Sequence, residues 1–441
     1  MYVTKTPKSS FAALIPFLVF LVFYLGLSIW AKDFYCVPMP IAFIVASAVA
    51  LWQNKRQKLA EKVEIYARGM GESNIMIMCL IFVLAGAFAA VAKGAGSVDA
   101  AVRISRHLIP ESLILPEFFF IGCFISLAIG TSCGTIAALT PIAAGITSVL
   151  NIPPELMIGA VIGGAMFGDN MSMISDTTIA ATRTQNVAMR DKFIMNFKMI
   201  LPAALITFGL YFFAGMNIQG GGEVPSSSWL DLILIAPYIL ILIGALLNFN
   251  VMALLFAGTF ITMMIGIFTG NLEFWKGLAI AGEGVLGMAE TLIVAILAGG
   301  LLCIIKYNGG INYLMSKIEK AISSRYGCEF GIMLLVGAIN LFTANNTVAI
   351  VIAGPIAKEL GNKYKCDPRR IASILDTASC VVQGLIPYGA QILIAIGIAR
   401  GAGLKISSLS LIGTLYYPML LGVSLILSIV IAKVLSRRKS R

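Results

Sequence analysis

Charged residues are scarce in this chain, and histidine is nearly absent. Of the 441 residues, 12% are charged and 59% are hydrophobic, and His107 is the single histidine. One histidine cannot form a histidine-ligated metal cluster, and the 8 cysteines have no Cys-x-x-Cys spacing. Neither a zinc site nor a disulfide framework is predicted. We therefore expect no cofactor.

Long polar segments are missing too, and so is a nucleotide-binding motif. Apolar runs of about 18 residues or more, which are typical of membrane spans, recur along the whole length. The sequence has no GxxxxGK[ST] loop, which disfavours an ATP-driven pump and a nucleotide-dependent enzyme. It also lacks a repeated filter sequence or a ring of pore-lining charges, which argues against an ion channel.

The net charge of +11 comes from clusters of Lys and Arg between the apolar runs, one of them at residues 183–198. Such clusters are typical of cytoplasmic loops that face anionic lipid, and they give no reason to expect a nucleic-acid partner. They predict a multi-pass protein in the lipid bilayer, with both termini on the cytoplasmic side.

The apolar runs predict an all-α polytopic membrane protein with about 10–13 transmembrane helices. Glycine, proline and polar residues interrupt several runs, which indicates broken helices. The interrupted runs cover residues 117–150, 155–181, 330–357 and 371–398.

Both termini can lie on one side if runs 117–150 and 330–357 each return to the side they left. Each would then be a re-entrant hairpin or a pair of short spans. The first would enter from outside and the second from inside, as in two inverted-topology repeats. We therefore expect two membrane halves, residues 1–216 and 217–441, with one repeat in each.

Matched residues also favour two repeats. Thr131 and Thr135 have the spacing of Thr343 and Thr347. Farther along the chain, one constant interval relates Asp169, Ser172 and Asp176 to Asp376, Ser379 and Gln383. An alternative register pairs Asp176 with Asp376.

Two carboxylates, Asp169 and Asp176, lie in a run that otherwise has the composition of a membrane interior. An ionisable side chain there costs about 2.5–3.5 kcal/mol on insertion scales, so it is a functional candidate. Hydroxyl groups surround the acids, and oxygen donors are the ligands that hard cations such as Na⁺ prefer. The predicted ion- and proton-binding residues are Asp169, Asp176, Ser172, Ser175 and Thr177, with Asp376 as a partner from the second half. Helix capping, or pairing with Arg183, is the structural alternative.

The first and second helix breaks offer neutral oxygens to the same site. A break in a membrane helix frees backbone N–H and C=O groups, and it persists where it lines a cavity or binds something. The expected ligands at the breaks are Thr131, Ser132, Thr135, Asn345, Asn346 and Thr347. Close helix packing through small residues is the alternative explanation. Na⁺ is the metal ion expected at this site.

Two acids in one site suit an exchanger that binds Na⁺ or H⁺ but not both. A low dielectric raises the proton affinity of a carboxylate, and a second carboxylate nearby raises that of one member of the pair further. Na⁺ entry and H⁺ release can then compete for the same oxygen atoms.

In these segments the chain resembles the NhaC-type Na⁺/H⁺ antiporter family, within the wider ion transporter superfamily. The resemblance extends over about residues 75–430 and rests on 130–137 (Gly-Thr-Ser-Cys-Gly-Thr-Ile-Ala), 167–178 (Phe-Gly-Asp-Asn-Met-Ser-Met-Ile-Ser-Asp-Thr-Thr), 345–347, 374–377 and 384–388. Met173 and Cys133 stand where members commonly have proline and tryptophan. The resemblance implies an ion-coupled secondary transporter of the cell inner (cytoplasmic) membrane, with Asp169 and Asp176 in its ion and proton site. The wider family also includes exchangers and symporters of carboxylates and amino acids.

We therefore expect a secondary active transporter that exchanges Na⁺ (or Li⁺) for H⁺ by alternating access, and not an enzyme. The alternative is a Na⁺- or H⁺-coupled transporter or exchanger of a small carboxylate or amino acid. A carboxylate substrate would need a compensating cation, and the apolar runs hold no unambiguous Lys or Arg, which favours cation exchange. A homodimer is compatible with this architecture.

Overall fold

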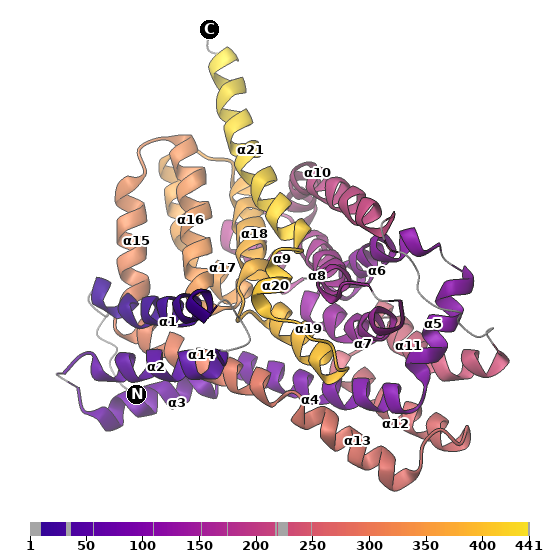
Figure 1. The fold of residues 1–441 in the computed structure, drawn as a ribbon. Helices are drawn as coiled ribbons and strands as arrows, with labels where there is room; N and C mark the ends of the chain where they lie inside the picture. Colours follow the sequence, from indigo (N-terminus) through magenta and orange to yellow (C-terminus); the bar gives the residue numbers. More distant parts are fainter. Residues whose placement is uncertain are drawn as a thin grey trace.

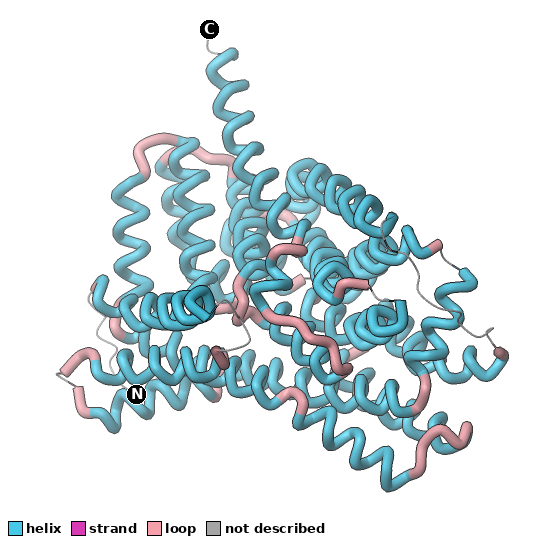
Figure 2. The backbone as a smooth tube through the Cα atoms, in the orientation of Figure 1, coloured by secondary structure: helices cyan, strands magenta, loops and turns pink. Residues whose placement is uncertain are grey.

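The computed structural model describes residues 10–31, 37–55, 57–108, 110–150, 152–173, 175–216, 218, 228–247 and 249–439. Within these ranges the regular elements are helices joined by loops, and no strand occurs (Figure 2). The expected all-α fold is confirmed.

The helices follow one another along the whole chain (Figure 1). Up to residue 216 they are η1 (Phe11–Leu14), α1 (Ile15–Ala31), α2 (Met39–Trp52), α3 (Leu59–Met70), α4 (Ser73–Gly94), α5 (Ser97–Leu108), η2 (Glu111–Leu113), α6 (Ile114–Ile129), α7 (Ser132–Leu150), α8 (Pro154–Met171), α9 (Asp176–Gln185) and α10 (Met189–Met216). After it they are α11 (Trp229–Leu246), α12 (Val251–Phe268), α13 (Phe274–Leu286), α14 (Ala289–Tyr307), α15 (Gly310–Ala321), α16 (Arg325–Thr343), α17 (Asn346–Lys363), α18 (Pro368–Leu385), α19 (Ala390–Gly401), α20 (Ser408–Ile412) and α21 (Tyr416–Lys439). The expected boundary between the halves, at residues 216 and 217, follows α10 in a connection most of which lies outside the described ranges.

Nine stretches of the described chain are long and apolar enough to cross a membrane. The broken pairs α8–α9 and α18–α19 each count as one stretch, and the apolar parts of α2, α6, α7 and α11 are shorter than a full span. The nine full-length stretches and the four shorter apolar helices together agree with the expected architecture of about 10–13 transmembrane helices.

The interrupted runs 117–150 and 330–357 each divide at a residue with a left-handed backbone conformation. Gly130 ends α6 with a φ of 77°, which glycine adopts without steric cost because it has no Cβ. Ala344 ends α16 with a φ of 45°. The adjacent Asn345 caps α17, since its side-chain oxygen accepts a hydrogen bond from the Val348 N–H. In each case the helices on both sides of the break pack on each other.

The other two runs divide at short non-helical segments. α8 ends at Met171 and α9 begins at Asp176, while α18 ends at Leu385 and α19 begins at Ala390. The expectation of broken helices is confirmed. Membrane re-entry of the α6–α7 and α16–α17 pairs stays a prediction.

The broken helices form the centre of the molecule. In Figure 1, α8, α9, α18 and α19 lie in the middle, with α15 and α16 on one side and α6 and α10 on the other. α8 packs on α6 and α7, and α18 packs on α16 and α17. The short helix after each break packs on the opposite half: α9 packs on α17 and α18, and α19 packs on α7 and α4. The breaks therefore lie where the two halves meet.

The two central units have the same helix pattern. A single interval separates Gly130 from Ala344, Pro141 from Pro355, Pro154 from Pro368, and Met171 from Leu385. The same interval relates two hydrogen bonds that join neighbouring helices. The Ser126 hydroxyl donates to the Ala165 carbonyl at 2.6 Å, and the Asn340 amide donates to the Ser379 carbonyl at 2.7 Å.

This register differs from both registers expected from the sequence. It makes Gln383 the equivalent of Asp169, whereas the expected registers paired Asp376 with Asp169 or with Asp176. The registers differ because the helix ends and the hydrogen bonds between helices recur after one fixed number of residues. The polar residues that were matched in the sequence recur after other numbers of residues. An inverted orientation of the two units in the membrane stays a prediction.

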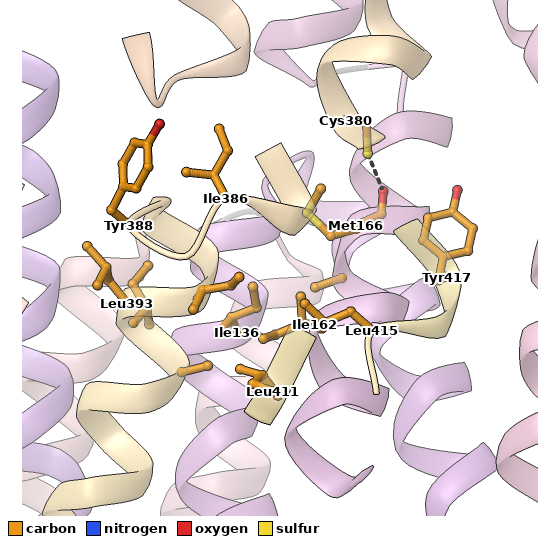
Figure 3. Packing of buried hydrophobic residues seen from close by; sticks show 14 of the residues in the cluster. Ile136, Ile162, Met166, Cys380, Ile386, Tyr388, Leu393, Leu411, Leu415 and Tyr417 are labelled. Atoms are coloured by element: carbon orange, nitrogen blue, oxygen red, sulfur yellow. Dashed lines mark hydrogen bonds between the residues drawn. The ribbon is translucent and has the colours of Figure 1, made fainter. Parts of the chain in front are cut away.

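Hydrocarbon side chains fill the space around the breaks. Figure 3 shows Ile386 and Tyr388, from the α18–α19 break, near Leu393 of α19. On the other side of the same view, the Cys380 thiol of α18 donates to the Met166 carbonyl of α8 at 3.6 Å. This packing lowers the local dielectric, so polar groups at the breaks interact more strongly than they would in water.

α6 and α8 approach so closely that Gly168 has no room for a side chain. A Cβ atom at this position would lie 2.4 Å from the carbonyl oxygen of Cys123. We expect Gly168→Ala to force the helices apart and to lower the free energy of unfolding by about 1–3 kcal/mol. The measurement is the melting temperature of the detergent-solubilised protein. Gly209→Ala, in α10, is the control because a Cβ there meets nothing within 4 Å; equal melting temperatures for the two variants would contradict the expected clash.

Candidate functional site

Asp169 lies in the last turn of α8 and is buried, with 6% of its surface exposed. Ser132 Oγ, in the first residue of α7, donates to Asp169 Oδ2 at 2.7 Å. Ser175 Oγ, which precedes α9, donates to Asp169 Oδ1 at 2.5 Å. Ser132 is the first residue of α7, so the positive end of the α7 dipole lies beside the carboxylate. The ends of three helices thus meet at one carboxylate.

The neighbouring hydroxyl groups divide into two sets. Thr177 is buried beside Ser175, with 2.9 Å between the two hydroxyl oxygens, so both belong to the surroundings of Asp169. Ser172 is also buried, and its hydroxyl donates to the Leu127 carbonyl of α6 at 2.8 Å. This bond attaches the α8–α9 break to α6.

Asp176, the other predicted acid of this segment, has a different environment. It is the first residue of α9 and its side chain is exposed, whereas Asp169 is buried. A carboxylate in the first turn of a helix is stabilised by the helix dipole. Of the two acids that were expected to share one buried site, the structure buries Asp169 and exposes Asp176.

A buried ion pair lies next to Asp169. Lys192, in the first turn of α10, and Asp376, in the middle of α18, pair with each other and are each 1% exposed. Lys192 Nζ also donates to the Asn170 carbonyl at 2.7 Å and to Thr178 Oγ1 at 2.8 Å. Asn196, one turn farther along α10, donates to Asn170 Oδ1 at 2.8 Å.

Lys192 corrects two expectations. The sequence places it in a basic cytoplasmic loop, and no unambiguous cation was expected inside an apolar run. α10 begins at Met189, however, so Lys192 is helical and its side chain enters the protein core. Asp376, the predicted partner from the second half, forms its ion pair with Lys192.

Two buried glutamines connect Ser132 with the second half. Gln391, at the start of α19, donates from Nε2 to Ser132 Oγ at 3.0 Å. Gln383, near the end of α18, donates from Nε2 to Gln391 Oε1 at 2.9 Å and to the Ala344 carbonyl at 3.0 Å. Hydrogen bonds therefore run without interruption from the α16–α17 break to Asp169.

The other predicted ligands at the breaks make local bonds. Asn345 Oδ1 accepts from the Val348 N–H, and Asn346 Oδ1 accepts from the Thr347 N–H at 3.1 Å, so both amides satisfy the first turn of α17. The Thr135 hydroxyl donates to the Thr131 carbonyl at 3.0 Å. Of the six predicted neutral ligands, Ser132 is the one that the described hydrogen bonds join to an acid.

Sequence reasoning missed Lys192 and Gln391, although each had a signal. Lys192 and Asn196 are four residues apart at the start of an apolar run, so they share one face of α10. Gln391 is the polar residue of an otherwise apolar segment that directly follows the α18–α19 break. Neither signal identifies the partner, which lies far away in the chain.

Comparisons with known proteins agree with a membrane transporter. The model of the Na⁺/H⁺ antiporter family matches residues 4–216 and 224–434. The chain is 24% identical over 387 residues to the Na⁺/H⁺ antiporter NhaC of Bacillus subtilis, covering 80% of this chain and 84% of that protein. It is also 24% identical over 396 residues to the malate-2H⁺/Na⁺-lactate antiporter of the same organism, covering 83% and 84% of the two chains.

Two further similarities are more distant. The arginine/ornithine antiporter ArcD of Halobacterium salinarum is 23% identical over 353 residues, covering 72% of this chain and 71% of that protein. Among solved structures, the YdaH transporter of Alcanivorax borkumensis aligns with a TM-score of 0.39 and 14% identity, covering 95% of this chain and 98% of that one. This TM-score is below the level that indicates a shared fold.

Proposed function

The protein belongs to the Na⁺/H⁺ antiporter family, and from this premise we propose that it exchanges Na⁺ (or Li⁺) for H⁺ across the cytoplasmic membrane by alternating access. In this proposal Asp169 is the carboxyl group that binds one ion or the other. One observation carries the assignment: Asp169 is a buried carboxylate at the meeting point of three helix ends, and no Lys or Arg pairs with it in the described part of the chain.

The hydroxyl groups of Ser132 and Ser175 suit each form of the carboxyl group. A hydroxyl carries one donor and two acceptor lone pairs, so it donates to an empty carboxylate. After rotation it offers a lone pair to Na⁺ or accepts the proton of the carboxylic acid. Na⁺ and H⁺ would use the same oxygen atoms and would therefore exclude each other.

We further propose that the halves 1–216 and 217–441 carry inverted repeats, with both termini on the cytoplasmic side. The common helix pattern of the two central units supports this arrangement. The exchange of α9 and α19 between the halves supports it too, because rocking of one unit against the other would move the breaks relative to each other. Asp176, exposed at the start of α9, would line the approach to Asp169.

A second candidate is coupled transport of a small carboxylate or amino acid. Lys192 favours it, because a buried ammonium group beside the site is the kind of cation that an anionic substrate needs. The proteins of similar sequence named for malate, lactate, arginine and ornithine also support it. The pairing of Lys192 with Asp376 weighs against it, since an anion would have to compete with that carboxylate.

Everted membrane vesicles from cells without other cation/H⁺ antiporters test the leading proposal. Respiration acidifies the vesicle interior, and a pH-sensitive dye reports the gradient. We expect NaCl or LiCl to dissipate the gradient in vesicles that contain the protein, while choline chloride has no effect. A gradient that withstands Na⁺, Li⁺ and K⁺, with the protein verified in the membrane, would contradict cation exchange. Na⁺-dependent uptake of labelled dicarboxylates and basic amino acids would then test the second candidate.

A further inference from the structure

Gln383 and Gln391 have no role in the exchange described above, yet they join the two units. Gln383 is 1% exposed and Gln391 is 2% exposed. Both N–H groups of the Gln383 amide are donated, one to the Ala344 carbonyl and one to Gln391 Oε1. Its own Oε1 is buried and accepts no hydrogen bond in the described structure. This amide is thus held by its donors alone.

The charge on Asp169 determines the direction of these hydrogen bonds. An ionised carboxylate accepts and never donates, so the Ser132 hydroxyl must point its proton at Asp169. The lone pairs of Ser132 Oγ then face Gln391, which presents its N–H group to them. Gln391 in turn presents its oxygen to Gln383, whose second N–H group reaches the Ala344 carbonyl.

Loading of Asp169 removes this requirement. A proton or Na⁺ bound between Asp169 Oδ2 and Ser132 takes one lone pair of Ser132 Oγ and turns the hydroxyl proton away from the carboxylate, which allows Ser132 to donate to Gln391. Gln391 accepts that proton if its amide rotates, and its N–H group then faces the N–H group of Gln383. Gln383 must rotate as well, which places its oxygen where Nε2 now lies, 3.0 Å from the Ala344 carbonyl. Two acceptors repel at this distance, so the α16–α17 break loses its bond to α18.

We propose that Gln383 and Gln391 are positioning residues that couple the loading of Asp169 to the α16–α17 break. They would keep the empty transporter from switching between its outward-facing and inward-facing states. This inference rests on the proposed exchange function. The amide pair has two discrete arrangements, and both the carboxylate and the break bias the balance between them. The link from Gln391 to Ser132 crosses between the two units that must move. An exchanger needs such a restraint, because an empty carrier that returns freely would let one ion leak without the other.

Methionine substitutions test the relay, since methionine resembles glutamine in size and has no amide. Purified Gln391→Met and Gln383→Met are reconstituted into Na⁺-loaded proteoliposomes, and Na⁺ exit and H⁺ entry are recorded together. We expect both variants to lose the fixed ratio of H⁺ to Na⁺ that the wild type maintains, with Na⁺ exit continuing without H⁺ entry. Gln185→Met is the matched control. Gln185 is 3% exposed and donates to the Gly354 carbonyl at 2.8 Å, so it also joins the two halves but lies outside the relay.

The two variants act at different links, so poor folding of one leaves the other as a test. A substitution that merely reduces the folded protein lowers both fluxes in proportion and leaves their ratio unchanged. A wild-type ratio in the folded variants would overturn the relay. An equal loss of the ratio in Gln185→Met would overturn it too, because the effect would then belong to packing between the halves. Wild-type proteoliposomes that exchange no Na⁺ for H⁺ would overturn the proposed function itself, and the relay with it.

Discussion

Asp169→Asn abolishes cation-dependent proton exchange, down to the level of vesicles without the protein: this is the largest effect that we expect. Asparagine has nearly the shape of aspartate, but it neither takes up a proton nor provides negative charge for Na⁺. The hydrogen bonds from Ser132 and Ser175 would have to rearrange around a side chain that is always neutral. The dye assay in everted vesicles measures the loss, and an immunoblot of the same membranes verifies the amount of protein.

Asp176→Asn is the matched control for this experiment. It removes the same charge from the same segment, but at an exposed position in the first turn of α9. We expect exchange to continue, with an increase in the Na⁺ concentration for half-maximal activity as the largest change. The opposite pattern, in which Asp176→Asn is inactive and Asp169→Asn transports, would move the ion-binding role to the exposed acid.

Lys192→Met is expected to destabilise the protein by about 3–5 kcal/mol, because it leaves the Asp376 carboxylate buried without its counter-ion. The Asn170 carbonyl and the Thr178 hydroxyl lose a donor at the same time. The measurement is the melting temperature in detergent, together with the yield of folded protein from gel filtration. Lys198→Met is the control, since Lys198 is exposed on the same helix.

The double variant Lys192→Met/Asp376→Asn shows whether the loss comes from the uncompensated charge. Without the carboxylate there is no buried charge left, so we expect the double variant to be more stable than Lys192→Met alone. The effects of neighbouring residues in one network are not additive, and the difference from additivity measures the coupling of the pair. A double variant that is less stable than Lys192→Met would contradict a role of the pair in neutralising charge.

Much of the architecture follows from local patterns in the sequence. Continuous apolar runs of this length predict membrane helices because a helix satisfies all of its backbone hydrogen bonds within one segment. The positions of the breaks follow from residues that act on their own backbone, as Gly130 does through its positive φ and Asn345 through its cap. Ser132, Ser175 and Asp169 could be singled out in the same way, as polar groups in apolar surroundings.

The register of the two units could not be obtained in this way. Polar residues matched Asp169 with Asp376, whereas the helix ends make Gln383 its equivalent. A few identical polar residues in two apolar segments define the register less well than the positions of eight helix termini do. Those positions depend on packing between helices and become visible once the chain is folded.

The sequence by itself determined the all-helical membrane class, the breaks and the two candidate acids near the end of α8, because each depends on residues that are close together in the chain. The tertiary structure alone decided which polar groups meet there. It exposes Asp176, pairs Lys192 with Asp376 and joins Gln391 to Ser132. The physical reason is that a side chain's burial and its hydrogen-bond partner depend on the helices packed against it, and here those helices come from the opposite half of the chain.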